Sequence, residues 1–202
     1  MNKFITSKCI LSFVAAFLLS IPAVRAEINP KPFVIPELKS WTGAEGITAP
    51  SGRIVIKNAK AKAVAEALAS DYQTMFGKQL EVATSGSKAG DIVLSIKNDK
   101  ALGPEGYILN IDRTIELTAT TEQGLFWATR SLLQISEQHK NGLPKGKTVD
   151  VPEYKLRGFM IDCGRKFIPM DYLRNLTKVM AYYKMNTLQI HLNDNGFRQY
   201  FN

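Results

Sequence analysis

The chain has 202 residues, of which 26 are Lys or Arg and 18 are Asp or Glu, giving a net charge of +8 at neutral pH. Its lysines are scattered along the sequence and do not alternate with aromatic residues in a stripe, which argues against a nucleic-acid-binding face. The length allows one domain and an additional segment.

Residues 1–26 have the pattern of a cleaved signal peptide. Lys3 and Lys8 supply positive charge, Cys9–Ile21 is an apolar run, and Ala26 ends a small-residue cleavage site. The run is shorter than the roughly 20 residues of a membrane-spanning helix, and no later segment is apolar enough to cross a bilayer. A membrane anchor or a buried helix is the alternative interpretation. We therefore expect an exported protein, periplasmic or extracellular, without membrane insertion after cleavage and with a net charge of +5.

Cleavage would leave Cys163 as the single cysteine. An internal disulfide is then impossible, so the fold must be stabilised by packing. A small buried residue is a simpler interpretation of Cys163 than a nucleophile.

Residues 27–150 are predicted to form an α+β domain, a small sheet with two helices. Residues 27–50 contain several prolines and little periodicity, so they are expected to be an extended lead-in. The helices are predicted over residues 61–76, ended by Gly77, and over residues 120–139, with Thr120 as the N-cap. The strands are predicted at residues 53–57, 80–82, 91–96, 107–112 and 115–118, the last two forming a hairpin.

Residues 154–192 change to a strand, helix, strand pattern. Leu156–Ile161 and Thr187–Leu192 are short apolar strands, and Met170–Tyr183 is an amphipathic helix between them. The helix is expected to turn Leu173, Leu176, Met180 and Tyr183 inward. This order predicts one βαβ unit of a parallel sheet, which requires further elements to bury its strands.

Polar residues follow both of these strands. Asp162 and Arg165 come after the first, and His191 and Asp194 come at the end of the second. Functional groups in parallel α/β barrels gather at the C-terminal ends of the strands. A mixture of carboxylate, amide and guanidinium groups there suits a hydroxyl-rich ligand such as a sugar.

Two sequence motifs carry a family resemblance. Residues 157–169 (RGFMIDCGRKFIP) and 180–194 (MAYYKMNTLQIHLND) resemble the first two strands of the catalytic barrel of family 20 glycoside hydrolases, the β-N-acetylhexosaminidases. Residues 105–135 resemble the accessory domain before that barrel, although other glycosidase families carry a similar domain. The resemblance implies an accessory domain over residues 27–150 and the start of a TIM barrel over residues 151–202.

The resemblance also implies roles for individual residues. Arg165 matches the arginine that binds hydroxyls of a terminal N-acetylhexosamine, and Asp194 and His191 match residues of the same pocket. Asp162 is expected to organise its loop by pairing with Arg165 or a neighbour, and Arg157 to be structural at the N-terminal end of its strand. A core histidine is the alternative for His191. No metal and no cofactor are implied.

The family mechanism is substrate-assisted hydrolysis, in which an Asp-Glu pair orients the substrate's acetamido group and protonates the leaving oxygen. No Asp-Glu or Glu-Asp dipeptide occurs in these 202 residues. Asp162 and Asp194 could form a direct acid and nucleophile pair instead, but nothing else in the sequence supports this.

A whole barrel takes roughly 250 residues, whereas residues 154–202 supply 49. We therefore expect a truncated gene product or a partial sequence of a hexosaminidase, inactive alone. The alternatives are a non-catalytic secreted glycan-binding protein, a degraded remnant, or another retaining glycosidase on the same scaffold. The substrate would be a glycan ending in N-acetylglucosamine or N-acetylgalactosamine.

Overall fold

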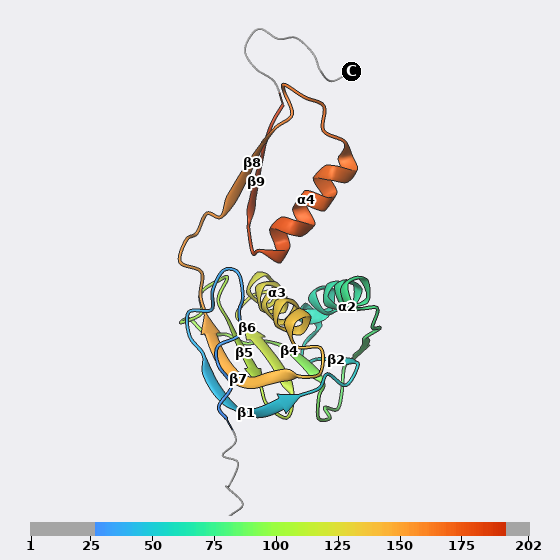
Figure 1. Cartoon of the computed structure of the whole chain (residues 1–202), viewed down its shortest axis with the longest axis vertical. Coiled ribbons are helices and arrows are strands. Elements are labelled where there is room, and N and C mark those ends of the chain that lie inside the picture. The colour runs from blue at the N-terminus through green and yellow to red at the C-terminus, as the bar shows by residue number, and fades with distance from the viewer. Residues whose placement is uncertain (1–26, 193–202) are drawn as a thin grey trace, which may run out of the picture.

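The computed structural model describes residues 27–192, which form a seven-stranded sheet domain and a βαβ unit (Figure 1). The sheet has the order β1-β7-β5-β6-β4-β2-β3. Its strands are β1 (Thr42–Thr48), β2 (Arg53–Ile56), β3 (Glu81–Ala83), β4 (Ile92–Ile96), β5 (Tyr107–Ile111), β6 (Ile115–Ala119) and β7 (Leu143–Asp150). Strands β3, β2, β4 and β6 are mutually parallel, whereas β5 and β7 pair antiparallel with their neighbours.

Two helices cover one face of this sheet (Figure 1). Helix α2 (Lys62–Phe76) follows a short 3₁₀ turn, η1 (Ala59–Ala61), and helix α3 (Glu122–Gln138) connects β6 to β7. The core between the layers is made of fully buried aliphatic side chains, among them Leu68, Leu94, Leu109, Leu117, Leu125 and Leu132. The predicted α+β accessory domain with two helices is therefore present, with a larger sheet than expected.

Strands β1 and β7 correct the sequence prediction. The supposed lead-in contains β1, and the segment after α3 forms β7, which pairs with both β1 and β5. Both segments contain Gly, and β7 also contains Pro and Lys, residues that are depleted in strands. In β7 the glycine has a packing reason, because a Cβ atom on Gly146 would lie 2.3 Å from the Trp41 ring.

The helix boundaries agree with the sequence except in detail. Helix α2 ends at Gly77, which has a positive φ of 66° as expected for a C-cap. The N-cap of α3 is Thr121 rather than Thr120, and its hydroxyl accepts a hydrogen bond from the Gly124 amide at 3.0 Å.

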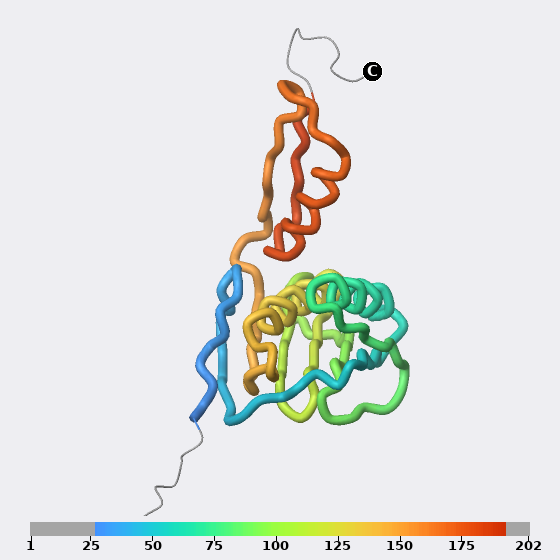
Figure 2. The backbone as a smooth tube through the Cα atoms, turned by 45° about the vertical axis from the view of Figure 1, so that its right-hand side comes forward, coloured from blue at the N-terminus to red at the C-terminus, as the bar shows by residue number. Residues whose placement is uncertain are grey.

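The βαβ unit consists of β8 (Gly158–Asp162), α4 (Met170–Tyr182) and β9 (Thr187–His191). The two strands are parallel, as predicted, and pair in register from Gly158 with Thr187 to Asp162 with His191. The inward face of α4 is buried at Met180 only, and Tyr183 is exposed rather than inward. The unit projects from the helical layer of the accessory domain, with the N-terminal ends of its strands toward that domain (Figure 2).

Candidate functional site

The C-terminal ends of β8 and β9 bring three of the predicted site residues together. Asp162 and His191 are register partners, and the Cys163 amide donates to the His191 carbonyl at 2.8 Å. The Asp162 carboxylate accepts from the Gly164 amide at 2.9 Å and lies 3.3 Å from the Arg165 Nε atom. Asp162 therefore both shapes the loop after β8 and contacts the Arg165 guanidinium.

Exposure differs between these side chains. Arg165 is 78% exposed, Asp162 is 32% exposed and His191 is half-buried. A guanidinium presented to solvent in this way can donate two parallel hydrogen bonds to adjacent hydroxyls. Asp194 lies outside the described residues. Cys163 is buried, as a small packing residue would be.

Arg157 lies at the opposite, N-terminal end of β8. Its guanidinium donates to the carbonyls of Lys184 and Tyr154, both at 2.7 Å, and to the carboxylate of Glu105 in the accessory domain. The guanidinium carbon lies 5.6 Å from the centroid of the Trp127 ring, within the range of a cation–π contact. Arg157 thus joins the two parts of the chain rather than contributing to the polar loops.

Asn186 reinforces this junction at the start of β9. Its side-chain oxygen accepts from the Arg157 amide at 3.0 Å, and its side-chain nitrogen donates to the Lys155 carbonyl at 2.8 Å. The same nitrogen lies 3.4 Å from Glu105. Glu105 also accepts from the Trp127 indole at 2.9 Å.

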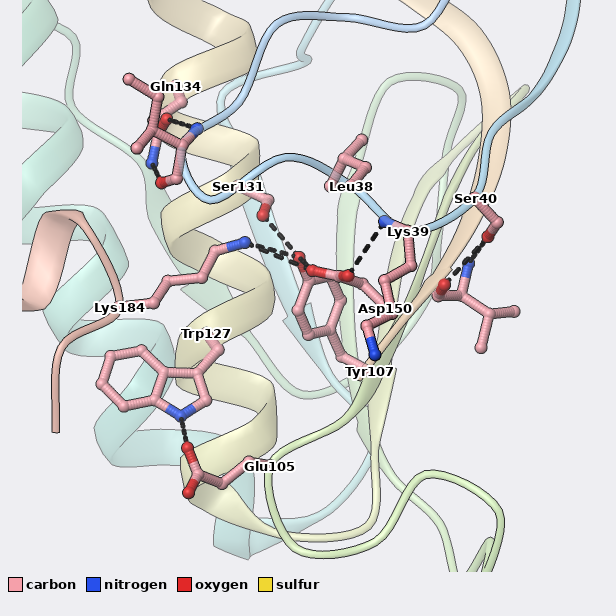
Figure 3. Close-up of polar contacts among 12 residues, drawn as sticks. Leu38, Lys39, Ser40, Glu105, Tyr107, Trp127, Ser131, Gln134, Asp150 and Lys184 are labelled. Atoms are coloured by element: carbon pink, nitrogen blue, oxygen red, sulfur yellow. Dashed lines mark hydrogen bonds and ion pairs between the residues drawn. The ribbon is translucent and has the colours of Figure 1, made fainter. Parts of the chain in front are cut away.

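A buried polar network lies beside the junction (Figure 3). The Tyr107 hydroxyl lies 2.6 Å from both Asp150 and Ser131, and the Lys184 ammonium lies 2.8 Å from Tyr107 and 3.4 Å from Asp150. The Lys39 amide donates to the other Asp150 oxygen at 3.2 Å. These contacts satisfy the buried carboxylate from several sides.

Burial alters the titration of this network. It raises the pKa of Tyr107 well above its ordinary value, and the Asp150 charge adds to the increase. Burial lowers the pKa of Lys184, while the Asp150 carboxylate offsets part of that decrease. The ammonium of Lys184 is therefore held in an environment that disfavours its charge.

A cavity of about 190 Å³ opens next to the network. Its apolar wall is formed by Pro36, Trp127, Val151 and Pro152, and the charged residues around it include Glu105, Asp150, Arg157 and Lys184. Those four side chains form two ion pairs, Glu105 with Arg157 and Asp150 with Lys184. The cavity therefore offers mainly apolar surface.

The residues of this junction are far apart in the sequence. Glu105 and Arg157 are 52 residues apart, and Lys184 and Tyr107 are 77 residues apart, so no local pattern connects them. The sequence shows only that no glycine follows the helix predicted over residues 170–183, at a place where glycine is the common residue.

Between residues 27 and 192, no group of three or more His, Cys, Asp or Glu side chains is arranged to hold a metal ion. None of the helices in that same part of the chain has the length and apolar character that a membrane span requires.

The chain matches two family profiles in succession. "Glycosyl hydrolase family 20, domain 2" matches residues 31–151, and "Glycosyl hydrolase family 20, catalytic domain" matches residues 154–201. The two matches cover the accessory domain and the βαβ unit, respectively.

The chain is also similar to individual hexosaminidases and related glycosidases. A β-hexosaminidase of Vibrio furnissii is 36% identical over 54% of this chain and 18% of its own length, and a lacto-N-biosidase of Bifidobacterium bifidum is 30% identical over 77% and 14%. A mutant β-hexosaminidase of Streptomyces plicatus, solved with its product GlcNAc, superposes with a TM-score of 0.71 at 28% identity, covering 84% of this chain and 36% of that one. The chain thus spans a minor part of each of these proteins.

Proposed function

Because this chain belongs to glycosyl hydrolase family 20, we propose that it supplies the accessory domain and the first βαβ unit of the catalytic barrel of a β-N-acetylhexosaminidase. Such an enzyme releases terminal, non-reducing N-acetylhexosamine residues from glycans. The observation that carries the proposal is the group of Asp162, Arg165 and His191 at the C-terminal ends of two parallel strands. This is the end of a barrel where active sites lie.

Arg165 is proposed to bind the sugar. Its exposed guanidinium would donate to two adjacent hydroxyls of the terminal residue, and its contact with Asp162 would limit the positions it can take. His191 is proposed to support the same pocket together with Asp194. Arg157, at the far end of β8, is proposed to be structural because it bonds the accessory domain.

The hydrolytic groups are proposed to come from the remainder of the barrel. In a substrate-assisted mechanism the acetamido oxygen of the sugar attacks the anomeric carbon, and a carboxylic acid protonates the leaving oxygen. The present residues would hold the sugar in position while that chemistry occurs. GlcNAc, which is bound in the Streptomyces plicatus enzyme, is the sugar we favour, and GalNAc is the second candidate.

Residues 1–26 are proposed to be an export signal, which would place the mature protein in the periplasm or outside the cell. The basis is the order of charge, apolar run and small residues along the sequence. These residues lie outside the described part of the chain. An extracellular or periplasmic glycosidase would meet glycan chain ends directly.

The decisive experiment is an activity assay on the chain extended through the downstream reading frame. Aryl N-acetyl-β-glucosaminide, aryl N-acetyl-β-galactosaminide and aryl β-glucoside are compared as substrates. Hydrolysis of the first two but not of the glucoside is expected, because substrate assistance requires the acetamido group. Equal hydrolysis of the glucoside would indicate a different retaining glycosidase on this scaffold.

A non-catalytic glycan-binding protein is the second candidate. The group of Asp162, Arg165 and His191 would suit such a protein as well, because binding of sugar hydroxyls does not itself require a hydrolytic group. The downstream reading frame separates the two candidates: an Asp-Glu pair in frame supports the enzyme, whereas a stop codon directly after Asn202 supports the binding or remnant protein.

A further inference from the structure

Lys184 occupies a backbone position that normally belongs to glycine. It follows α4 with a φ of 57°, the one non-glycine residue with positive φ in the described part of the chain. Its amide donates to the Ala181 carbonyl at 3.0 Å, and the next amide, of Met185, donates to the Met180 carbonyl at 2.8 Å. This pair of hydrogen bonds is a Schellman motif, whose left-handed residue is usually glycine because a Cβ atom is disfavoured there. A lysine at this position indicates that its side chain has a separate role.

The side chain of Lys184 enters the accessory domain. The residue is 6% exposed, and its ammonium lies 5.2 Å from the Tyr107 ring centroid and bonds the Tyr107 hydroxyl and the Asp150 carboxylate. Tyr107 begins β5 and Asp150 ends β7, so both belong to the sheet domain (Figure 3). The turn between α4 and β9 therefore places one charged group inside the neighbouring domain.

Further contacts surround this insertion. Gln134 of α3 donates to the carbonyls of Ile35 and Tyr182, at 2.9 and 3.0 Å, and the Tyr182 hydroxyl donates to Glu137 at 2.6 Å. Arg157 and Glu105, which pair with each other, line the same cavity as Lys184. The contacts of Tyr182 and Arg157 with the accessory domain require the same placement of the βαβ unit.

We propose that Lys184 is an anchor that fixes the orientation in which the βαβ unit docks on the accessory domain. A buried ion pair gains little net stability, because desolvation of the two charges offsets their attraction. A misplaced unit, however, would leave the Asp150 carboxylate or the Lys184 ammonium buried without its partner, which is strongly unfavourable. The pair therefore selects one docking arrangement. The inference does not depend on the proposed hydrolytic activity.

The test is amide hydrogen exchange of the whole chain with three substitutions. Lys184→Gly relieves the positive φ and removes the whole side chain. Lys184→Met removes the ammonium, with its charge and its hydrogen-bond donors. Asp150→Asn removes the charge of the partner. Each is expected to accelerate exchange in β8 and β9 by about tenfold or more, the effect of losing a hydrogen bond to a charged group. Lys178→Met, on the exposed side of α4, is the matched control and should leave exchange unchanged.

The double variant Lys184→Met with Asp150→Asn distinguishes the effect of the interaction between the two residues from the effect of each residue alone. Because no unpaired charge remains, it should recover much of the lost protection and show non-additive effects. Additive effects would overturn the proposal. So would a Lys184→Gly variant as protected as the wild type, since Lys184 would then only terminate the helix. Equal loss of protection in β4 and β6 would also overturn it, by showing that Lys184 supports the accessory core.

Discussion

The Arg157 guanidinium donates to the Glu105 carboxylate across the boundary between the two parts of the chain. Their side chains are 13% and 15% exposed, and Glu105 also accepts from the Trp127 indole at 2.9 Å. One carboxylate thus joins the hairpin region, α3 and the start of β8. Charge-assisted bonds in such a sheltered place contribute more than pairs on the surface.

Glu105→Gln is predicted to destabilise the protein by about 1–3 kcal/mol, because Arg157 loses its charged partner while remaining mostly buried. Urea unfolding measures the effect. Glu66→Gln is the control, since Glu66 pairs with Lys62 at 3.8 Å on an exposed helix face, where such a pair contributes about 0–1 kcal/mol. Equal destabilisation by the two substitutions would contradict this assignment.

Asp91 is predicted to make the accessory domain sensitive to acid. Its side chain is fully buried, and burial alone would raise its pKa. The carboxylate, however, accepts hydrogen bonds from the Ser51 hydroxyl at 2.6 Å and the Lys88 amide at 2.8 Å. These bonds and the nearby Arg53 charge lower the pKa of Asp91 overall. A carboxyl whose pKa is lowered by folding adds stability above its unfolded pKa of about 3.9 and loses it as pH falls through the folded value.

The measurement is urea unfolding of the wild type and Asp91→Asn from pH 7 down to pH 3. The variant should be less stable by about 1–3 kcal/mol at pH 7, from weakened hydrogen bonds. This difference should shrink as the wild-type carboxylate becomes protonated. A difference that stays constant over the whole range would exclude Asp91 as a source of acid sensitivity.

The predictable part of the fold follows local patterns. The stripe Val64, Leu68 and Tyr72 identified α2, and Gly77 marked its end. Strand β7 could not be predicted in the same way, because its Gly146 is explained only by the Trp41 ring packed on it. The strand is held by its pairing with β1 and β5, and no pattern within the sequence of β7 predicts that pairing.

The candidate site also has one part that the sequence predicts and one part that it does not. The two polar loops were predicted because parallel strands place their C-terminal ends together, and this geometry put Asp162 opposite His191. The junction around Lys184 was not predicted, since its partners Tyr107 and Asp150 belong to other parts of the sequence. Tertiary contacts between distant residues leave almost no local signal.

Arg165→Lys is predicted to reduce kcat/KM sharply in the chain extended through the rest of the barrel. Lysine keeps the charge but lacks the planar fork that can donate to two adjacent hydroxyls. Hydrolysis of an aryl N-acetyl-β-glucosaminide measures the effect. Arg174→Lys, on an exposed face of α4, is the matched control and should retain activity. Near-normal kcat/KM for Arg165→Lys would remove Arg165 from the sugar site.

The secreted protein is predicted to begin at Glu27. Residues 24–26, Val-Arg-Ala, place small residues where signal peptidase requires them, after the apolar run. N-terminal sequencing of the exported protein checks this directly, and replacing Ala26 with a bulky residue should block or move the cleavage. Exported protein that retains Met1 would show that residues 1–26 are not a cleaved signal.

A polypeptide of residues 27–202 made by itself is predicted to have no hexosaminidase activity. It contains no Asp-Glu pair to protonate the leaving oxygen and orient the acetamido group. General acid catalysis alone typically contributes about 10²–10⁴-fold. Purified protein is assayed with an aryl N-acetyl-β-glucosaminide. Clear turnover that co-purifies with the polypeptide, and that is lost with Arg165→Lys, would refute the prediction.

The same polypeptide is predicted to be cleaved by proteases first after the accessory sheet. Phe159, Met160 and Ile190 are 41–55% exposed, although strands of a complete barrel are covered on both faces. Open strand edges and uncovered apolar side chains favour local opening, which exposes the backbone to cleavage. Strand β7 pairs with β1 as far as Lys147 and with β5 as far as Asp150, so the resistant product should end between residues 150 and 157. Mass spectrometry of the digest locates that end. Because Lys184 is proposed to hold the βαβ unit in place, Lys184→Gly should give the same product faster. Uniform resistance through Leu192 would instead show that the unit is stable without the rest of a barrel.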